Sequence, residues 1–160
     1  MMESMTDPVV EEAFARVERS FHKLGALAKH TARAQATIVH PELRSAGWMV
    51  FRTISHSGPV AVADIIAETG MDKSVVSRQL KSLREWGLVE VGRDAHDARV
   101  VVARLSPLGE ERSAQVRERI LERYRSALES WTGDDLATLA DLLERLAPAV
   151  EAPLRAEEGR

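Results

Sequence analysis

The sequence predicts a mainly α-helical fold with one small β-hairpin. Apolar residues recur at helical spacings of three and four through most of the chain, and cap residues flank these stretches. The period changes to alternation only after Gly87, in two short valine-rich runs. The 160 residues suffice for one domain with helical extensions, and the apolar share of 44% suffices for a core.

The first expected helix is long and carries one apolar stripe. Asp7 followed by Pro8 is typical of an N-cap with proline at the first helical position. We expect the helix to end near Thr37. Its apolar residues alternate spacings of four and three, which suits packing against another helix: Val10, Phe14, Val17, Phe21, Leu24 and Ala28.

Three shorter helices are expected next. The first runs from Pro41 to the break at "HSGP", and the second spans 62–69 and ends at Gly70, a left-handed cap. Asp72 is expected to cap the third, which Gly87 stops.

The helix after Asp72 has two distinct faces. Its apolar positions, which would face the interior, are Val76, Leu80 and Leu83. The other face has basic and hydroxyl groups but no carboxylate, in Ser74, Ser77, Arg78 and Lys81. This face therefore suits a negatively charged partner, although the net charge of the chain is −3.

A hairpin and two more helices complete the chain. The runs "LVEVGR" and "RVVVARL" alternate as strands do, and "DAHDA" between them predicts the turn. Ser106 with Pro107 opens a charged helix that is expected to reach about Trp131. Thr132 and Asp135 resemble a capping box, which opens a leucine-rich helix. We expect Pro148 to end this helix and 148–160 to be a flexible tail.

A short helix, a tight turn, a basic helix and a hairpin, in this order, predict a winged helix-turn-helix. In this arrangement the second helix lies in the DNA major groove, and the hairpin reaches the backbone or the minor groove. Arg78 is best suited to a guanine edge, whereas Lys81 and the serines suit phosphate. A solvated helix face with incidental cations is the alternative, which the turn and the hairpin disfavour.

The segments "DKSVVSRQLKSLREWGLVEV", "DAHDAR" and "LSPLG" resemble the multiple-antibiotic-resistance regulator (MarR) family of bacterial transcription factors. The most specific part is Asp-x-x-Asp-x-Arg at the hairpin, here Asp94, Asp97 and Arg99. The resemblance implies that Arg99 enters the minor groove and that Asp97 orients it. Two residues depart from the common pattern. Ala98 replaces a second basic residue, and Val75 replaces threonine.

The resemblance also implies an assembly. Long dimerisation helices, over 7–39 and 107–147, would flank a winged helix-turn-helix over 41–106 in a single domain spanning 1–160. A homodimer would place two recognition helices roughly 34–36 Å apart and bind a pseudo-palindromic operator in double-stranded DNA. The residues expected at the DNA are Lys73, Ser74, Val75, Ser77, Arg78, Lys81 and Arg99.

The resemblance further implies a small-molecule effector site, where the first two helices meet the winged domain. Trp48 and Arg52 lie one turn apart, so they can share a face, with His22 across from them. Arg52 would pair with an anionic aromatic compound, and Trp48 would supply an apolar wall. The alternative places Trp48 in the core and Arg52 in water.

Composition and motifs exclude several classes. Without cysteine the chain has no disulfide, no thiolate metal site and no thiol switch. No apolar run is long enough to span a membrane, and the start lacks a signal-peptide pattern, so a cytoplasmic protein is expected. No motif of an enzyme and no cofactor motif is present, so we expect neither catalysis nor a cofactor.

Two further alternatives remain. Asp94, His96 and Asp97 are metal-ligand types, but a flexible hairpin would lack a supporting shell, so no metal is expected. The winged fold could also serve as a protein-interaction module without specific DNA binding. The basic helix face and Arg99 favour the regulator, which we expect to be a repressor.

Overall fold

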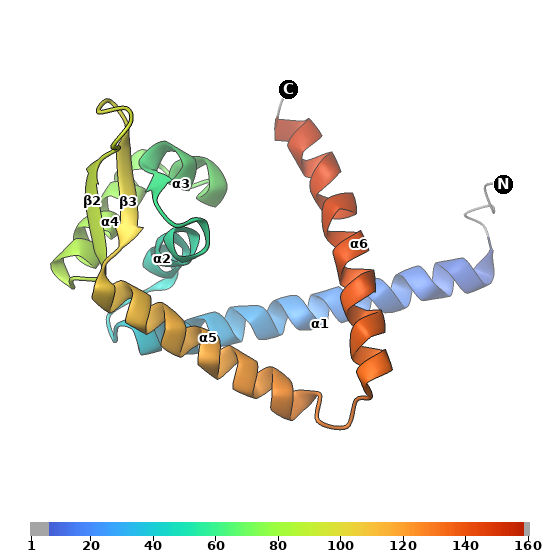
Figure 1. Ribbon diagram of the computed structural model, residues 1–160. Helices are drawn as coiled ribbons and strands as arrows, with labels where there is room; N and C mark the ends of the chain where they lie inside the picture. Colours follow the sequence, from blue (N-terminus) through green and yellow to red (C-terminus); the bar gives the residue numbers. More distant parts are fainter. Residues whose placement is uncertain (1–6, 159–160) are drawn as a thin grey trace. The chain divides into compact units, whose positions relative to one another are not determined.

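The computed structural model describes residues 7–158, with side chains over 7–150. The chain divides after Glu118 into two compact units, which are described separately. The first unit contains a long helix, a helix-turn-helix with a three-stranded sheet, and the start of α5 (Figure 1). The mainly helical fold with a small β-hairpin wing is confirmed.

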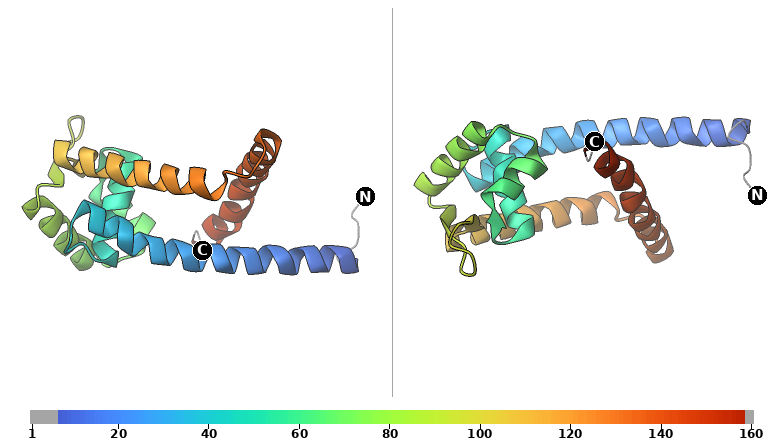
Figure 2. Two further views of the ribbon diagram at one scale, coloured as in Figure 1. Left: turned by 90° about the horizontal axis from the view of Figure 1, so that it is seen from below. Right: turned by 90° about the horizontal axis from the view of Figure 1, so that it is seen from above.

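Helix α1 (Pro8–Val39) extends far beyond the helices that follow it in the first unit (Figure 2). The predicted cap is present, because the Asp7 side chain accepts a hydrogen bond from the backbone N–H of Val9 at 2.9 Å. Burial on α1 is confined to its C-terminal end, at Ala36 and Val39. Its apolar stripe is left largely exposed within the protomer.

Helix α2 (Ser45–Ser57) begins four residues later than Pro41, so that part of the prediction is wrong. His40 precedes proline and is extended, with φ −160° and ψ 138°, as proline requires of its neighbour. The backbone then turns, and Leu43 N–H donates to His40 C=O at 3.0 Å. Arg44 is the N-cap, so the helix starts only after this turn.

Helices α3 (Val62–Thr69) and α4 (Lys73–Glu85) form the predicted pair. Gly70 adopts the left-handed conformation expected of it, with φ 64°. The side chains that are almost completely buried come from α2, α3, α4 and the segment just after α4, and are Val50, Phe51, Ile54, Ile65, Val76, Leu83 and Leu88. This core fixes one face of α4 against α2.

The sheet is antiparallel, with strand order β1-β3-β2. The predicted hairpin is formed by β2 (Val89–Arg93) and β3 (Val101–Leu105). A third strand, β1 (Val60–Ala61), was not expected; it pairs with Ala103 and Val102 of β3. Two residues are too few to show a period in the sequence, so only the fold reveals this strand.

Helix α5 (Pro107–Ala127) is capped by Ser106, whose hydroxyl accepts from Gly109 N–H at 3.0 Å. The helix ends at Ala127, before the expected Trp131. Leu128 still donates to Tyr124 C=O, but Trp131 then donates to Leu128 C=O, which closes a tighter turn. This turn leads to the cap of the next helix.

Helix α6 (Gly133–Glu158), in the second unit, opens with the predicted capping box. Asp135 N–H donates to the Thr132 hydroxyl at 3.2 Å, and Thr132 N–H donates to the Asp135 carboxylate at 3.1 Å. The expectation that Pro148 ends the helix and begins a flexible tail is wrong, because α6 continues to Glu158.

Proline removes one main-chain donor and crowds the preceding turn, but alanine, glutamate and leucine dominate around it and favour helix. Residues 159–160 of the expected tail lie outside the described residues. Over the described residues, no helix is both long and apolar enough to cross a bilayer.

Candidate nucleic-acid interface

Helix α4 separates its two faces as the sequence predicts. Val76 and Leu83 are fully buried and Leu80 is 6% exposed. The polar side chains on the other face are exposed: Lys73, Ser74, Ser77, Arg78 and Lys81. Val75 lies at the boundary and is half-buried. The apolar face therefore holds the helix, and the basic face is free to meet a partner.

The cations of α4 are weakly engaged within the protein. Lys81 lies 3.9 Å from Glu85, and both side chains are mostly exposed. An exposed pair of this kind contributes about 0.3–0.5 kcal/mol, so Lys81 can exchange it for a phosphate. Arg78 and Lys73 have no ion pair among the described side chains.

Asp72 stands at the N-cap of α4, but its carboxylate makes no capping hydrogen bond. The backbone still starts the helix there, since Val76 N–H donates to Asp72 C=O at 3.1 Å. The expected side-chain cap is therefore wrong, although the boundary of the helix is right. The backbone N–H groups of the first turn of α4 lie at the same end of the helix as Lys73 and Ser74.

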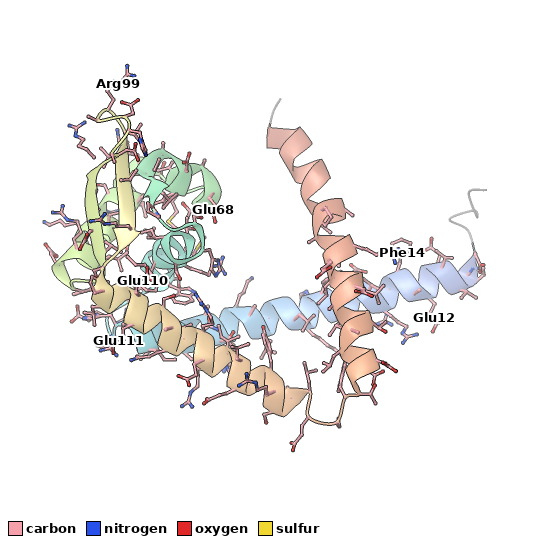
Figure 3. The ribbon with its side chains drawn as sticks, viewed as in Figure 1. Glu12, Phe14, Glu68, Arg99, Glu110 and Glu111 are labelled. Carbon is pink, nitrogen blue, oxygen red and sulfur yellow. The ribbon has the colours of Figure 1, made fainter. Side chains whose placement is uncertain are left out.

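Arg99 projects from the free end of the β2–β3 hairpin (Figure 3). Its side chain is 91% exposed, and its Nε donates to Asp97 Oδ1 at 3.1 Å. A second bond runs from Arg99 Nη2 to Asp97 Oδ2 at 3.3 Å. This two-pronged pairing fixes the direction of the guanidinium while its outer edge stays in water.

The turn below Arg99 is held by Asp94. Its Oδ1 accepts from the N–H groups of His96 and Asp97, at 2.8 and 3.0 Å. These two backbone bonds, that from Asp97 first, lower the pKa of Asp94. The pKa of Asp97 is also lowered, chiefly by its side-chain bond with Arg99. Both carboxylates are therefore acceptors, which suits a turn that orients a cation.

The other basic residues of the hairpin are engaged in its own structure. Arg93 Nη1 donates to Ala98 C=O at 2.7 Å across the turn. Arg104 pairs with Glu90 on the facing strand at 2.7 Å. These contacts stiffen the hairpin, and they leave Arg99 as the cation placed at its tip.

The three residues expected at the effector site differ in burial. Trp48 is 6% exposed and stacks on Phe51, with ring centroids 6.2 Å apart. Arg52 and His22 are exposed. Trp48 therefore packs in the core, and no hydrogen bond, ion pair or aromatic stack in the described part of the chain joins these three side chains. Among the described residues, no group of three or more His, Asp or Glu side chains is arranged to hold a metal ion.

One contact near the interface was not expected from the sequence. The rings of His40 and Trp86 stack, with centroids 4.1 Å apart and planes 14° from parallel. The two residues are distant in sequence and end different helices. Local patterns carry no signal for such a pair.

Comparisons with known proteins agree with this geometry. Residues 45–100, which include α2, α3, α4 and the hairpin turn, match the MarR family. The winged-helix region of the chain is that of the MarR family. The chain is a transcriptional regulator with a DNA-binding winged helix, and the MarR family consists of transcriptional regulators.

Two regulators of Bacillus subtilis (strain 168) are similar to this chain. The uncharacterised HTH-type transcriptional regulator YxaD is 26% identical over 107 residues, 67% of this chain and 75% of YxaD. The uncharacterised HTH-type regulator YdgJ is 28% identical over 91 residues, 57% of this chain and 56% of YdgJ.

Among solved structures, a MarR family protein from Bacillus stearothermophilus superimposes with a TM-score of 0.76. It is 20% identical, and the match covers 88% of this chain and 97% of that one. This likeness confirms the winged helix fold with its flanking helices.

Proposed function

We propose that this chain is a homodimeric, sequence-specific repressor that binds a pseudo-palindromic operator and is released by a small ligand. The observation that carries the DNA part is the exposed basic face of α4 beside a buried apolar face. Arg99, held by Asp97 at the tip of the wing, supports it. Together they offer one element for a major groove and one for a minor groove.

Each side chain of this surface has a proposed contact. Arg78 would read a base edge, because its planar fork can donate twice to guanine. Lys73, Lys81, Ser74 and Ser77 would bind phosphate, which positions the helix without reading sequence. Val75, half-buried at the edge of this face, would touch a thymine methyl group or pack. Arg99 would enter the minor groove.

Exposed apolar side chains support the homodimer. On α1, Phe14 is 62% and Leu24 59% exposed, and both belong to the predicted stripe. On α6, Leu142 and Leu143 are more than half exposed. Apolar surface of this extent on a helix marks a protein contact. A second copy of the chain would cover it in the proposed dimer, whose helices are those of 7–39 and 107–147.

Substitutions in the DNA surface test the proposal by gel shift on the DNA upstream of the chain's own gene. Arg78→Ala should weaken binding by about 1–3 kcal/mol and relax base preference. Lys81→Ala should weaken binding to all sequences and reduce the salt slope by about one unit. Arg99→Ala should lower the affinity while the dimer and the melting temperature stay unchanged.

Arg33→Ala is the charge-matched control, since Arg33 is exposed on α1 and belongs neither to the basic face of α4 nor to the wing. It should bind as the wild type does. If all three DNA-surface variants also bind like the wild type, the DNA surface lies elsewhere. If the wild type itself prefers no fragment, a protein-interaction module replaces the regulator.

The effector part rests on the resemblance and on the exposed Arg52, because Trp48 is buried in the core. An anionic aromatic acid would weaken DNA binding if it binds a dimer state in which the spacing of the two recognition helices no longer fits successive major grooves. The loss of DNA affinity then measures how strongly the acid prefers that state. Salicylate-like acids titrated into the protein–DNA complex should release the wild type more readily than Arg52→Ala. Equal release from both would remove Arg52 from the site.

A further inference from the structure

The stack of His40 on Trp86 joins the ends of two helices with different proposed roles, dimerisation for α1 and DNA binding for α4. His40 is the C-cap of α1, the helix that carries the exposed apolar stripe. Trp86 is the C-cap of α4, the helix that carries the basic face. With centroids 4.1 Å apart and planes 14° from parallel, the two rings are stacked.

The backbone on the α1 side of this stack is held firmly. His40 N–H donates to Ala36 C=O at 3.0 Å, and His40 C=O accepts from Leu43 N–H at 3.0 Å. The ring is also fixed, because His40 Nδ1 accepts from Glu42 N–H at 3.3 Å. The imidazole is therefore a rigid extension of the α1–α2 turn.

The backbone on the α4 side is equally constrained. Trp86 N–H donates to Ser82 C=O at 3.0 Å, and Leu88 N–H donates to Leu83 C=O at 2.9 Å. Between them Gly87 takes φ 71°, a left-handed conformation that suits glycine. The backbone that carries the indole is therefore fixed to the end of α4.

The core holds α4 by one apolar face, and the stack adds a fixed point at its end. Helix α4 has 13 residues. At ~1.5 Å per residue, a tilt of ~10° about one end would move the other end by roughly 3 Å. Hydrogen bonds to base edges require donor–acceptor distances of about 2.7–3.2 Å, so such a tilt would break them.

We propose that the His40–Trp86 stack is a positioning contact that ties the angle of the recognition helix α4 to the dimerisation helix α1. His40 and Trp86 touch no DNA in this proposal; they set how Arg78 and its neighbours meet the groove. The inference rests on the proposed function for its DNA readout. The restraint on α4 itself can be measured in the free protein.

The test compares His40→Ala, which removes the stack, with His40→Phe, which keeps a flat ring. His30→Ala is the control, because His30 is an exposed histidine on the same helix. Each full-length variant is assayed for affinity to the DNA upstream of its own gene and to mixed-sequence competitor DNA. Amide hydrogen exchange over α4 is measured in the DNA-free protein, together with the dimer mass and the melting temperature.

His40→Ala should lose at least fivefold in affinity for its own upstream DNA, while affinity for competitor DNA stays within twofold. Its amides in the last turns of α4 should exchange faster, and those of α3 should not. His40→Phe should restore both readouts, and His30→Ala should match the wild type.

A merely structural role would lower both DNA affinities in parallel with the melting temperature, and this result would overturn the proposal. Unchanged exchange over α4 in His40→Ala would overturn it as well. If the wild type prefers no DNA, the proposed function fails, and the exchange over α4 alone decides whether the stack restrains that helix.

Discussion

At the scale of the residue, the wing shows how short polar side chains aim a cation. Asp94 closes the turn through two backbone N–H groups, and Asp97 pairs with Arg99 through both carboxylate oxygens. The resemblance implied that Asp97 orients Arg99, and the hydrogen bonds are consistent with that role. The contact of His40 with Trp86 could not be inferred, because it depends on where the ends of two helices meet in space.

Replacing Asp97 with asparagine should weaken binding to the operator several-fold. Asparagine keeps one acceptor oxygen, but it loses the charge and the second acceptor, so the guanidinium of Arg99 gains freedom. Gel shifts of Asp97→Asn measure the effect. Asp141→Asn, on an exposed residue of α6, is the control and should be silent. A variant that binds as tightly as the wild type would show that Arg99 needs no orientation by Asp97.

The same contacts determine the pH below which the turn of the wing loses stability. The pKa of both Asp94 and Asp97 lies below the ordinary 3.8, so ionisation of these carboxylates favours the folded turn. This contribution is fully present above about pH 4 and is lost as the pH falls through the lowered pKa. The ¹³C NMR signal of the Asp97 carboxylate should therefore stay constant from about pH 8 to pH 5. A titration of that signal centred above pH 5 would contradict the assignment.

At the scale of the element, predictions held where the signal was local. The bounds of α3, the burial of one face of α4, the hairpin and the capping box of α6 are each set by side chains within a few positions. The start of α2 and the strand β1 depend on neighbours that are distant in sequence. Pro148 shows the limit of a local rule, since helix α6 continues through it.

The close packing of the start of α5 on the segment before β2 requires a glycine at position 109. A Cβ at Gly109 would overlap the carbonyl oxygen of Leu88, and this backbone cannot move aside as a flexible side chain can. Ser106 strengthens this packing, since its N–H donates to Leu88 C=O at 3.0 Å and its hydroxyl donates to Gly87 C=O. The start of α5 is thereby packed directly on the segment that follows α4.

Gly109→Ala should lower the free energy of unfolding by about 1–3 kcal/mol, as expected when atoms are forced into a closely packed site. Urea denaturation followed by circular dichroism measures it. Gly92→Ala is the matched control, because a Cβ at Gly92, in β2, would meet nothing within 4 Å. The control should change the stability by less than about 0.5 kcal/mol. Equal midpoints for the two variants would mean that the packing at the start of α5 adapts to the added methyl group.

At the scale of the whole molecule, the proposed function needs two copies of the chain. Its first unit holds a winged helix-turn-helix with its own core, yet α1 extends beyond that core with its apolar stripe exposed. A single recognition helix contacts only one half-site of a palindrome, so a dimer gains affinity by binding both at once. In the proposed function, the stripe on α1 therefore forms the dimer that allows the basic faces of two α4 helices to bind DNA together.

Phe14→Glu should convert the proposed dimer into a monomer. Phe14 is 62% exposed in the protomer, and burying a phenylalanine contributes about 1.5–3 kcal/mol, while a buried, unpaired carboxylate opposes association. In a two-fold dimer the change occurs twice, so its effect doubles. Sedimentation at micromolar concentration should give the mass of one chain, and binding to the operator should weaken because the half-sites are no longer engaged together. Glu12→Ala, on an exposed position of α1 outside the stripe, should leave a dimer. A monomeric wild type, or a Phe14→Glu variant that stays dimeric, would show that the stripe on α1 does not form the interface.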